Sequence, residues 1–109
     1  MSYKAIIPEV EKIKQRIGNN LQYLREISGL TQQELAKELK MVQFRINAAE
    51  HGEIPSLEAL YPYSQYFQVS LGALIDHDFK ENPSVLLRDL LDETKRNLEW
   101  RVQQTINPS

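Results

Sequence analysis

The two histidines, His51 and His77, are the side chains best suited to bind a metal ion or to transfer a proton. His77 stands between Asp76 and Asp78, an arrangement that raises the question of a metal site. Consecutive side chains in a loop rarely converge on one ion, however, and no second histidine is close in sequence. We therefore expect no bound metal.

The residue patterns typical of catalysis are not found in the sequence. It has no cysteine, which removes thiolate nucleophiles, cysteine zinc sites and disulfides together and fits a reducing compartment. It also has no glycine-rich phosphate loop, no metal-ligand spacing and no nucleophile motif. The sequence therefore predicts a protein that is not an enzyme and that uses no cofactor.

The composition is that of a small globular protein. The chain has 109 residues, 41% hydrophobic and 26% charged, which suits one folded domain. Its net charge is -2, so no overall positive field attracts nucleic acid or anionic lipid. Basic stretches are local: residues 12–25 and 40–49 contain Lys and Arg but no acid. Because no apolar run is long enough for a signal peptide or a membrane span, we expect a cytoplasmic protein.

The spacing of apolar residues predicts helices joined by short turns. A first helix is expected over roughly residues 8–28. Its buried stripe would consist of Ile13, Ile17, Leu21, Leu24 and Ile27. Gly18 weakens this helix locally, and Gly29 suits the left-handed position just past its end.

Capping residues mark the helices that follow. Thr31 and Glu34 have the spacing of a capping box and begin a second helix, and a third is expected over residues 42–50. The buried faces of these two helices would contain Leu35, Ala36, Leu39, Ile46 and Ala49.

Two further helices complete the predicted domain. Ser56 would cap a helix over residues 57–68, and Ser70 would cap another that ends at Ile75. Pro62 is poorly suited to the interior of a helix, because it lacks the N–H group and crowds the preceding turn. The tight turn between the second and third helices has the spacing of a helix-turn-helix motif.

With these residues in place, the stretch from Ile17 to Ile75 resembles the helix-turn-helix family of phage repressors and Cro, often called XRE. The strings that carry the resemblance, in the order and spacing of that family, are IGNNLQYLRE, GLTQQELAKEL, INAAEHG, PSLEAL and FQVSLGALI. The resemblance implies an all-α, five-helix repressor-like DNA-binding domain over residues 17–77. Residues 1–16 would form an N-terminal extension of its first helix.

In the resembled family the second helix of the motif lies in the major groove of DNA. The resemblance therefore implies double-stranded DNA as the partner. The expected base contacts are Gln43, Phe44 and Asn47, and the expected phosphate contacts are Gln32, Lys40 and Arg45. The chemistry agrees, because Gln and Asn side chains pair with adenine and Phe contacts the methyl group of thymine.

Five further positions are interpreted through the same resemblance. An arginine that ends the first helix and a glutamate that ends the recognition helix form a partly buried ion pair in that family, which implies a structural pair between Arg25 and Glu50. Three departures from the family pattern subtract DNA affinity. Val42 replaces a capping Ser or Thr, Ala48 stands where Arg, Lys or Gln is common, and Glu53 stands where a basic residue is common.

The C-terminal region has a second apolar pattern. Residues 78–82 are expected to be a linker, and residues 83–109 to contain an amphipathic helix. Its apolar stripe includes Leu87, Leu91, Leu98 and Val102. The charges of this helix sum to zero, which favours a protein surface over a membrane as its partner. Two alternatives are open: the helix packs on its own domain, or it pairs with a second chain as a homodimer.

Two functions from different classes follow. The first is a sequence-specific transcriptional regulator, a dimeric repressor that acts by occupying an operator. The alternative is a protein-interaction module, for example antitoxin-like, that keeps the helix-turn-helix scaffold with weak or no DNA binding. In that case Phe44 and the C-terminal helix would be the contacts. Salt dependence separates the two, because phosphate binding releases counterions and an apolar interface need not.

Overall fold

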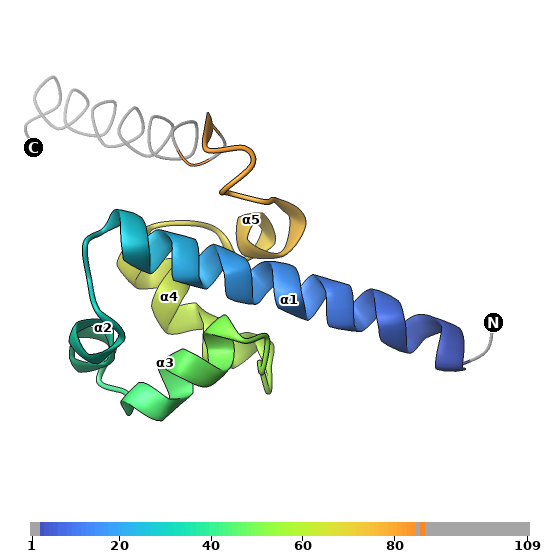
Figure 1. Cartoon of the computed structure of the whole chain (residues 1–109), viewed down its shortest axis with the longest axis horizontal. Helices are drawn as coiled ribbons and strands as arrows, with labels where there is room; N and C mark the ends of the chain where they lie inside the picture. The colour runs from blue at the N-terminus through green and yellow to red at the C-terminus, as the bar shows by residue number, and fades with distance from the viewer. Residues whose placement is uncertain (1–2, 85, 87–109) are drawn as a thin grey trace, which may run out of the picture.

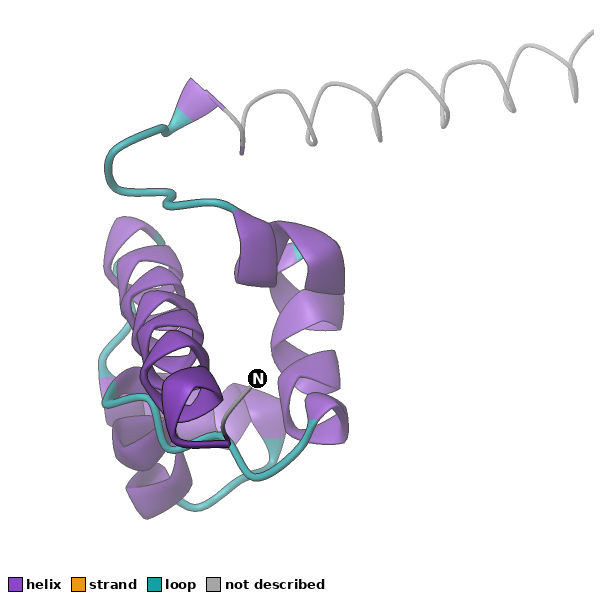
Figure 2. Cartoon of the chain, turned by 90° about the vertical axis from the view of Figure 1, so that its right-hand side faces the viewer, coloured by secondary structure: helices purple, strands orange, loops and turns teal. Residues whose placement is uncertain are grey.

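The computed structural model describes residues 3–84 and residue 86, and within them every regular element is a helix (Figures 1 and 2). In chain order the elements are α1 (Tyr3–Ile27), α2 (Gln32–Leu39), α3 (Gln43–Glu50), the 3-10 helix η1 (Leu57–Leu60), α4 (Tyr61–Phe67) and α5 (Leu71–Asp76). The all-α, five-helix class expected from the sequence is confirmed. The predicted helix within residues 83–109, with Leu87, Leu91, Leu98 and Val102, lies outside the described residues.

Helix α1 crosses the whole domain, with α2 and α3 on one side and α5 on the other (Figure 1). Its predicted start was wrong, because the helix begins at Tyr3 and passes through Pro8. The fixed φ of proline is close to the helical value, so Pro8 costs one backbone hydrogen bond without ending the helix. At the other end Gly29 adopts φ +73°, and the N–H of Leu30 donates to the carbonyl of Arg25, which is a Schellman motif.

The two motif helices begin and end through local hydrogen bonds. The backbone N–H of Glu34 donates to Thr31 Oγ1 at 3.1 Å, and the N–H of Thr31 donates to Glu34 Oε1 at 3.0 Å. This confirms the capping box, and these bonds from Thr31 lower the pKa of Glu34. Helix α2 ends at Leu39, and its C-cap Lys40 has a φ of 55° that turns the chain sharply toward α3.

The prediction of one helix over residues 57–68 was wrong. The segment is divided into η1 and α4, and Ser56 makes no side-chain capping bond. The division places Pro62 in the first turn of α4, where a missing N–H group costs nothing because the first turn has no intrahelical acceptor for it. The next cap is confirmed, since Ser70 Oγ accepts from the N–H of Ala73 at 3.0 Å.

The core is formed by side chains from every helix. The buried apolar residues are Ile17, Leu21, Leu24, Leu35, Ala36, Ile46, Leu60, Tyr63, Val69, Ala73, Leu74 and Phe79. Ile13, Leu39 and Ala49 pack against this cluster and are partly buried. Ile27 was wrongly included in the buried stripe: it is 57% exposed, because α1 ends there and the chain turns away.

A buried asparagine joins α1 to the end of the domain. Asn20 is 1% exposed, and its Nδ2 donates to the carbonyls of Leu74 at 2.8 Å and His77 at 2.7 Å. Its Oδ1 accepts from the N–H of Phe79 at 3.0 Å. Phe79 lies in the stretch 78–82, expected to be a linker, yet it is fully buried. The start of that stretch therefore packs on the helical domain.

Candidate nucleic-acid interface

Helix α3 has an inner face and an outer face with different chemistry. Ile46 and Glu50, one turn apart, are buried against the scaffold. Gln43, Phe44 and Asn47, which the sequence assigned to base contact, are all exposed, Phe44 by 77%. These three side chains therefore belong to the solvent-exposed surface of α3, which is its outer face.

Gln32 connects the two helices of the motif. It lies at the first position of α2 and is half-buried. Its Nε2 donates to Asn47 Oδ1 and to Glu50 Oε1, both at 3.2 Å. The residue predicted to contact phosphate thus also fixes the position of α3, and it engages the amide oxygen of Asn47.

Arg25 and Glu50 are in direct contact between α1 and α3. Arg25 Nε lies 2.7 Å from Glu50 Oε2, and Arg25 Nη2 lies 3.0 Å from Glu50 Oε1. Arg25 Nη1 also donates to the carbonyl of Leu30 at 2.9 Å. The side chains are only 12% and 2% exposed, and the hydrogen bonds to Glu50 raise the pKa of Arg25. A paired, hydrogen-bonded carboxylate therefore holds the C-terminal end of α3 in place.

The basic stretch over residues 12–25 is only in part a free cationic surface. Arg16 Nε donates to the carbonyl of Ile75 at 2.9 Å, and Arg25 is paired with Glu50. Both arginines therefore hold the fold. Lys40 and Arg45, the other cations assigned to phosphate contact, are exposed at the turn before α3 and on α3 itself.

Glycine 18 sets the distance between α1 and α3, a role that the sequence analysis missed. A Cβ atom built on Gly18 would lie 2.8 Å from the carbonyl oxygens of Ala49 and Glu50 and 2.8 Å from the nitrogen of Gly52. Asn20 was missed in the same way. Its signal in the sequence is its place on the apolar stripe, three residues after Ile17 and four before Leu24.

His51 and His77 make separate contacts. His51 Nδ1 lies 2.7 Å from the carbonyl oxygen of Asn47, whereas the carbonyl of His77 is bound by Asn20. In the part of the chain that the structure describes, no group of three His, Cys, Asp or Glu residues is arranged to hold a metal ion. None of the described helices combines the length and apolar character required to cross a membrane.

Replacement of Val42 by threonine is expected to raise the free energy of unfolding by about 1 kcal/mol. Val42 is the N-cap of α3, has extended backbone angles and makes no side-chain capping bond. Threonine keeps the β-branched shape and adds a hydroxyl that accepts from a free N–H of the first turn. Urea unfolding measures the change, with Val10→Thr on the exposed face of α1 as the control. Equal changes at both positions would contradict the capping role.

The chain was compared with known proteins in three ways. A family model described as helix-turn-helix matches residues 21–74, which run from the middle of α1 to α5 and include the contacts of α3 with Arg25 and Gln32. The searches of curated proteins and of solved structures found no match. Through residues 21–74, this chain belongs to the XRE-type helix-turn-helix family.

Proposed function

We propose that this chain is a transcriptional repressor that occupies an operator by placing α3 in the major groove of DNA. The observation that carries the proposal is the division of α3 into two faces. Its inner face is fixed through Ile46 and Glu50, while Gln43, Phe44 and Asn47 extend from its outer face. A rigidly held helix with exposed amide groups suits the direct readout of base edges.

The contacts of Gln32 refine the role of Asn47. Because Gln32 Nε2 engages Asn47 Oδ1, the amide nitrogen of Asn47 is the group that we propose donates to a base acceptor. Gln43 uses both its amide oxygen and its amide nitrogen in a bidentate contact to adenine. Phe44 packs on the methyl group of a thymine. Lys40, Arg45 and Gln32 bind the flanking phosphates.

Gln43→Ala and Asn47→Ala are each expected to cost about 1 to 3 kcal/mol of specific binding and to leave non-specific binding nearly unchanged. Arg45→Ala is expected to weaken both and to reduce the salt slope by about 1. The operator is first selected from a random DNA pool at low salt. Titrations on operator and scrambled DNA then measure the losses, with Gln65→Ala on the surface of α4 as the control. Equal losses for all three interface variants on both DNAs would contradict these roles.

We also propose that two chains associate through the helix of residues 83–109, with residues 17–77 as the DNA-binding domain and 78–82 as the connection. Operators read by this motif are commonly two-fold symmetric, and a dimer doubles the phosphate contacts. The proposed contacts are the apolar side chains of Leu87, Leu91, Leu98 and Val102.

A chain truncated after Asn82 is expected to be a folded monomer with much weaker operator binding, whereas the full chain is a dimer. The truncated chain keeps Phe79 and every other buried apolar residue of the described core, and it loses Leu86, which is partly buried against that core. Light scattering of both chains measures the masses. A monomeric full chain at tens of micromolar, or an unfolded truncated chain, would show instead that the C-terminal helix covers its own domain.

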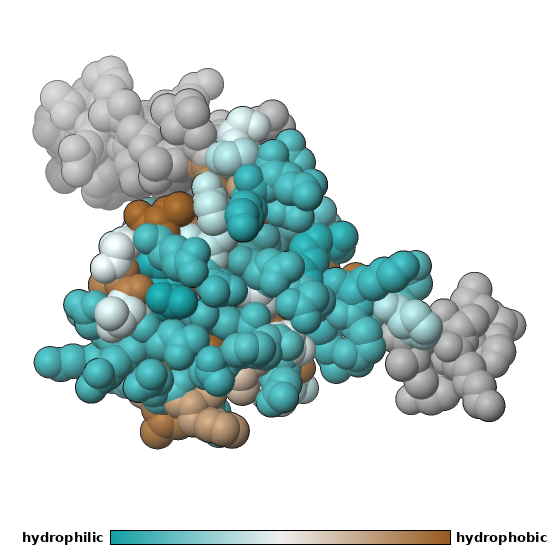
Figure 3. All heavy atoms as spheres, in the orientation of Figure 1, coloured by the Kyte–Doolittle hydropathy of each residue, from teal (hydrophilic) through white to brown (hydrophobic). Residues whose placement is uncertain are grey.

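One observation favours the second function, a protein-interaction module. Val42 and Phe44 are 63% and 77% exposed and stand two residues apart at the start of α3, where Figure 3 shows a hydrophobic patch at the lower edge of the domain. Large exposed apolar side chains are typical of protein contacts as well as of thymine contacts. Operator binding that weakens steeply with salt supports the repressor function. Absence of DNA binding even at low salt supports the protein-interaction module.

A further inference from the structure

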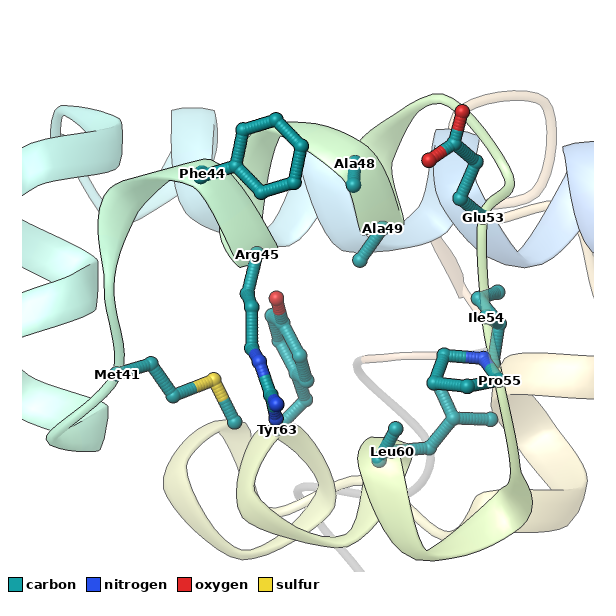
Figure 4. Close-up of a pocket in the computed structure, with 11 residues that line it drawn as sticks. Met41, Phe44, Arg45, Ala48, Ala49, Glu53, Ile54, Pro55, Leu60 and Tyr63 are labelled. Atoms are coloured by element: carbon teal, nitrogen blue, oxygen red, sulfur yellow. The ribbon is translucent and has the colours of Figure 1, made fainter.

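A pocket lies behind the recognition helix, between α3 and the segment from Glu53 to Tyr63 (Figure 4). Its volume is about 450 Å³, within the range of sites for small molecules. The pocket exists because Ala48 and Ala49 extend from α3 by a single methyl group each and leave the space above Leu60 unfilled. Its apolar walls are Met41, Ala49, Ile54, Pro55, Ala59 and Leu60.

The hydroxyl of Tyr63 is the main polar feature of the pocket. Tyr63 is 2% exposed, and within the described residues its hydroxyl has no hydrogen-bond partner. Figure 4 shows the ring extending from α4 toward α3 with the hydroxyl at its tip. Burial, and to a lesser degree the charge of Glu50, raises the pKa of Tyr63 to about 12, so the hydroxyl is a donor at neutral pH. A buried donor without an acceptor is costly, and a ligand acceptor removes that cost.

The charged residues that line the pocket indicate which chemical class of ligand it suits. Arg45 and Glu53 are the charged residues among those that line it. In Figure 4 the side chain of Arg45 points from α3 into the pocket, whereas the carboxylate of Glu53 points away from it. The interior is therefore apolar with one cation and one hydroxyl donor, a combination complementary to an apolar group that carries an anion.

We propose that this pocket binds a small apolar carboxylic acid, with its hydrocarbon part between α3 and η1 and its carboxylate on Tyr63 and Arg45. The volume suits a molecule of about one aromatic ring with a short side chain. Arg45 is exposed, so its long side chain is free to turn toward the carboxylate.

Ligand binding would also reduce DNA binding, a consequence that rests on the proposed function. Arg45 is the proposed phosphate contact and Phe44 the proposed thymine contact, and both line the pocket. A carboxylate that pairs with Arg45 competes with the phosphate for the same cation. By linkage, operator DNA weakens ligand binding by the same factor.

The site is tested on the full chain by NMR titration of its backbone amides with phenylacetate, 3-phenylpropionate and the neutral phenylacetamide. The acids are expected to shift resonances of residues 45–49 and 53–63 saturably. Phenylacetamide is expected to bind about tenfold more weakly, because it lacks the charge that pairs with Arg45. No saturable shift by either acid up to about 10 mM, beyond the affinity range of fragment-sized ligands, overturns the proposal.

Three variants separate pocket binding from binding elsewhere on the surface. Ala49→Leu fills the pocket and is expected to abolish the shifts, while Tyr63→Phe keeps the ring and is expected to weaken binding about tenfold. Tyr61→Phe, at a tyrosine 56% exposed and not part of the pocket, is the matched control and is expected to change nothing. If Ala49→Leu does not fold, the affinity of Tyr63→Phe decides whether the acid binds in the pocket. Equal affinity in Tyr63→Phe and Tyr61→Phe overturns the assignment.

The regulatory consequence has a separate readout. Saturating phenylacetate is expected to weaken operator binding by the wild-type chain and not by a folded Ala49→Leu variant. If the acid binds in the pocket and operator affinity is unchanged, the ligand site stands and its coupling to DNA is overturned. If no DNA is bound under any condition, the proposed function fails, while the NMR titration still decides the ligand site.

Discussion

Replacement of Glu50 by alanine is expected to lower the free energy of unfolding by about 3 to 5 kcal/mol. The substitution removes the carboxylate that accepts two hydrogen bonds from Arg25, whose side chain is 12% exposed. Arg25 would then retain a charge in a poorly solvated position with the carbonyl of Leu30 as its acceptor. Gln32 would lose its bond to Glu50 as well. Urea unfolding of both proteins measures the loss.

A double-mutant cycle separates the pair from its surroundings. Arg25→Met alone is expected to be at least as costly, because Glu50 is the more buried partner, and replacement of both by apolar residues is expected to recover much of the loss. Glu26 provides a matched control, since its carboxylate lies 4.0 Å from Arg25 but is 55% exposed. Glu26→Ala is expected to change stability by about 0 to 1 kcal/mol. A coupling energy near zero between residues 25 and 50 would remove the pair as a determinant of the position of α3.

The helix boundaries that were correctly predicted depend on local contacts. Thr31, Gly29 and Ser70 act within three or four residues of themselves, so their spacing in the sequence contains the needed information. The segment 57–68 was different. Whether Pro62 interrupts a long helix or begins a short one depends on how residues 53–60 pass under α3, which is a tertiary contact that local spacing does not define.

The candidate interface shows the same distinction. The exposure of Phe44 follows from the helical period, because a residue two positions before the buried Ile46 points to the other side of α3. Gln43 lies three residues before Ile46, so its exposure does not follow from the period and is set by packing at the start of α3. The basic stretch over residues 12–25 did not reveal that Arg16 is used in the fold, since the carbonyl that accepts its hydrogen bond, that of Ile75, is 59 residues away in sequence. The hydroxyl of Tyr63, which has no partner among residues 3–84 and 86, and the close approach at Gly18 are likewise products of packing between distant segments.

Gly18→Ala is expected to lower the free energy of unfolding by about 3 kcal/mol, although the same change in an ordinary helix interior raises it by about 1 kcal/mol. The added Cβ would lie 2.8 Å from three backbone atoms, those of Ala49, Glu50 and Gly52. Backbone atoms cannot rotate away as a flexible side chain does, so α3 must move from α1. That movement strains the contact between Arg25 and Glu50 and displaces the outer face of α3.

Gly72→Ala is the matched control, because Gly72 lies within α5 and an added Cβ would lie 4.0 Å from Ser70 Oγ, which is ordinary van der Waals contact. It is expected to raise stability by about 0.5 to 1 kcal/mol, the ordinary gain of alanine over glycine in a helix. The two variants therefore differ in sign for the same chemical change. Urea unfolding gives both values, and operator titration of Gly18→Ala is expected to show a loss of specific binding. A gain in stability at both positions would mean that α1 and α3 are not held in contact at Gly18.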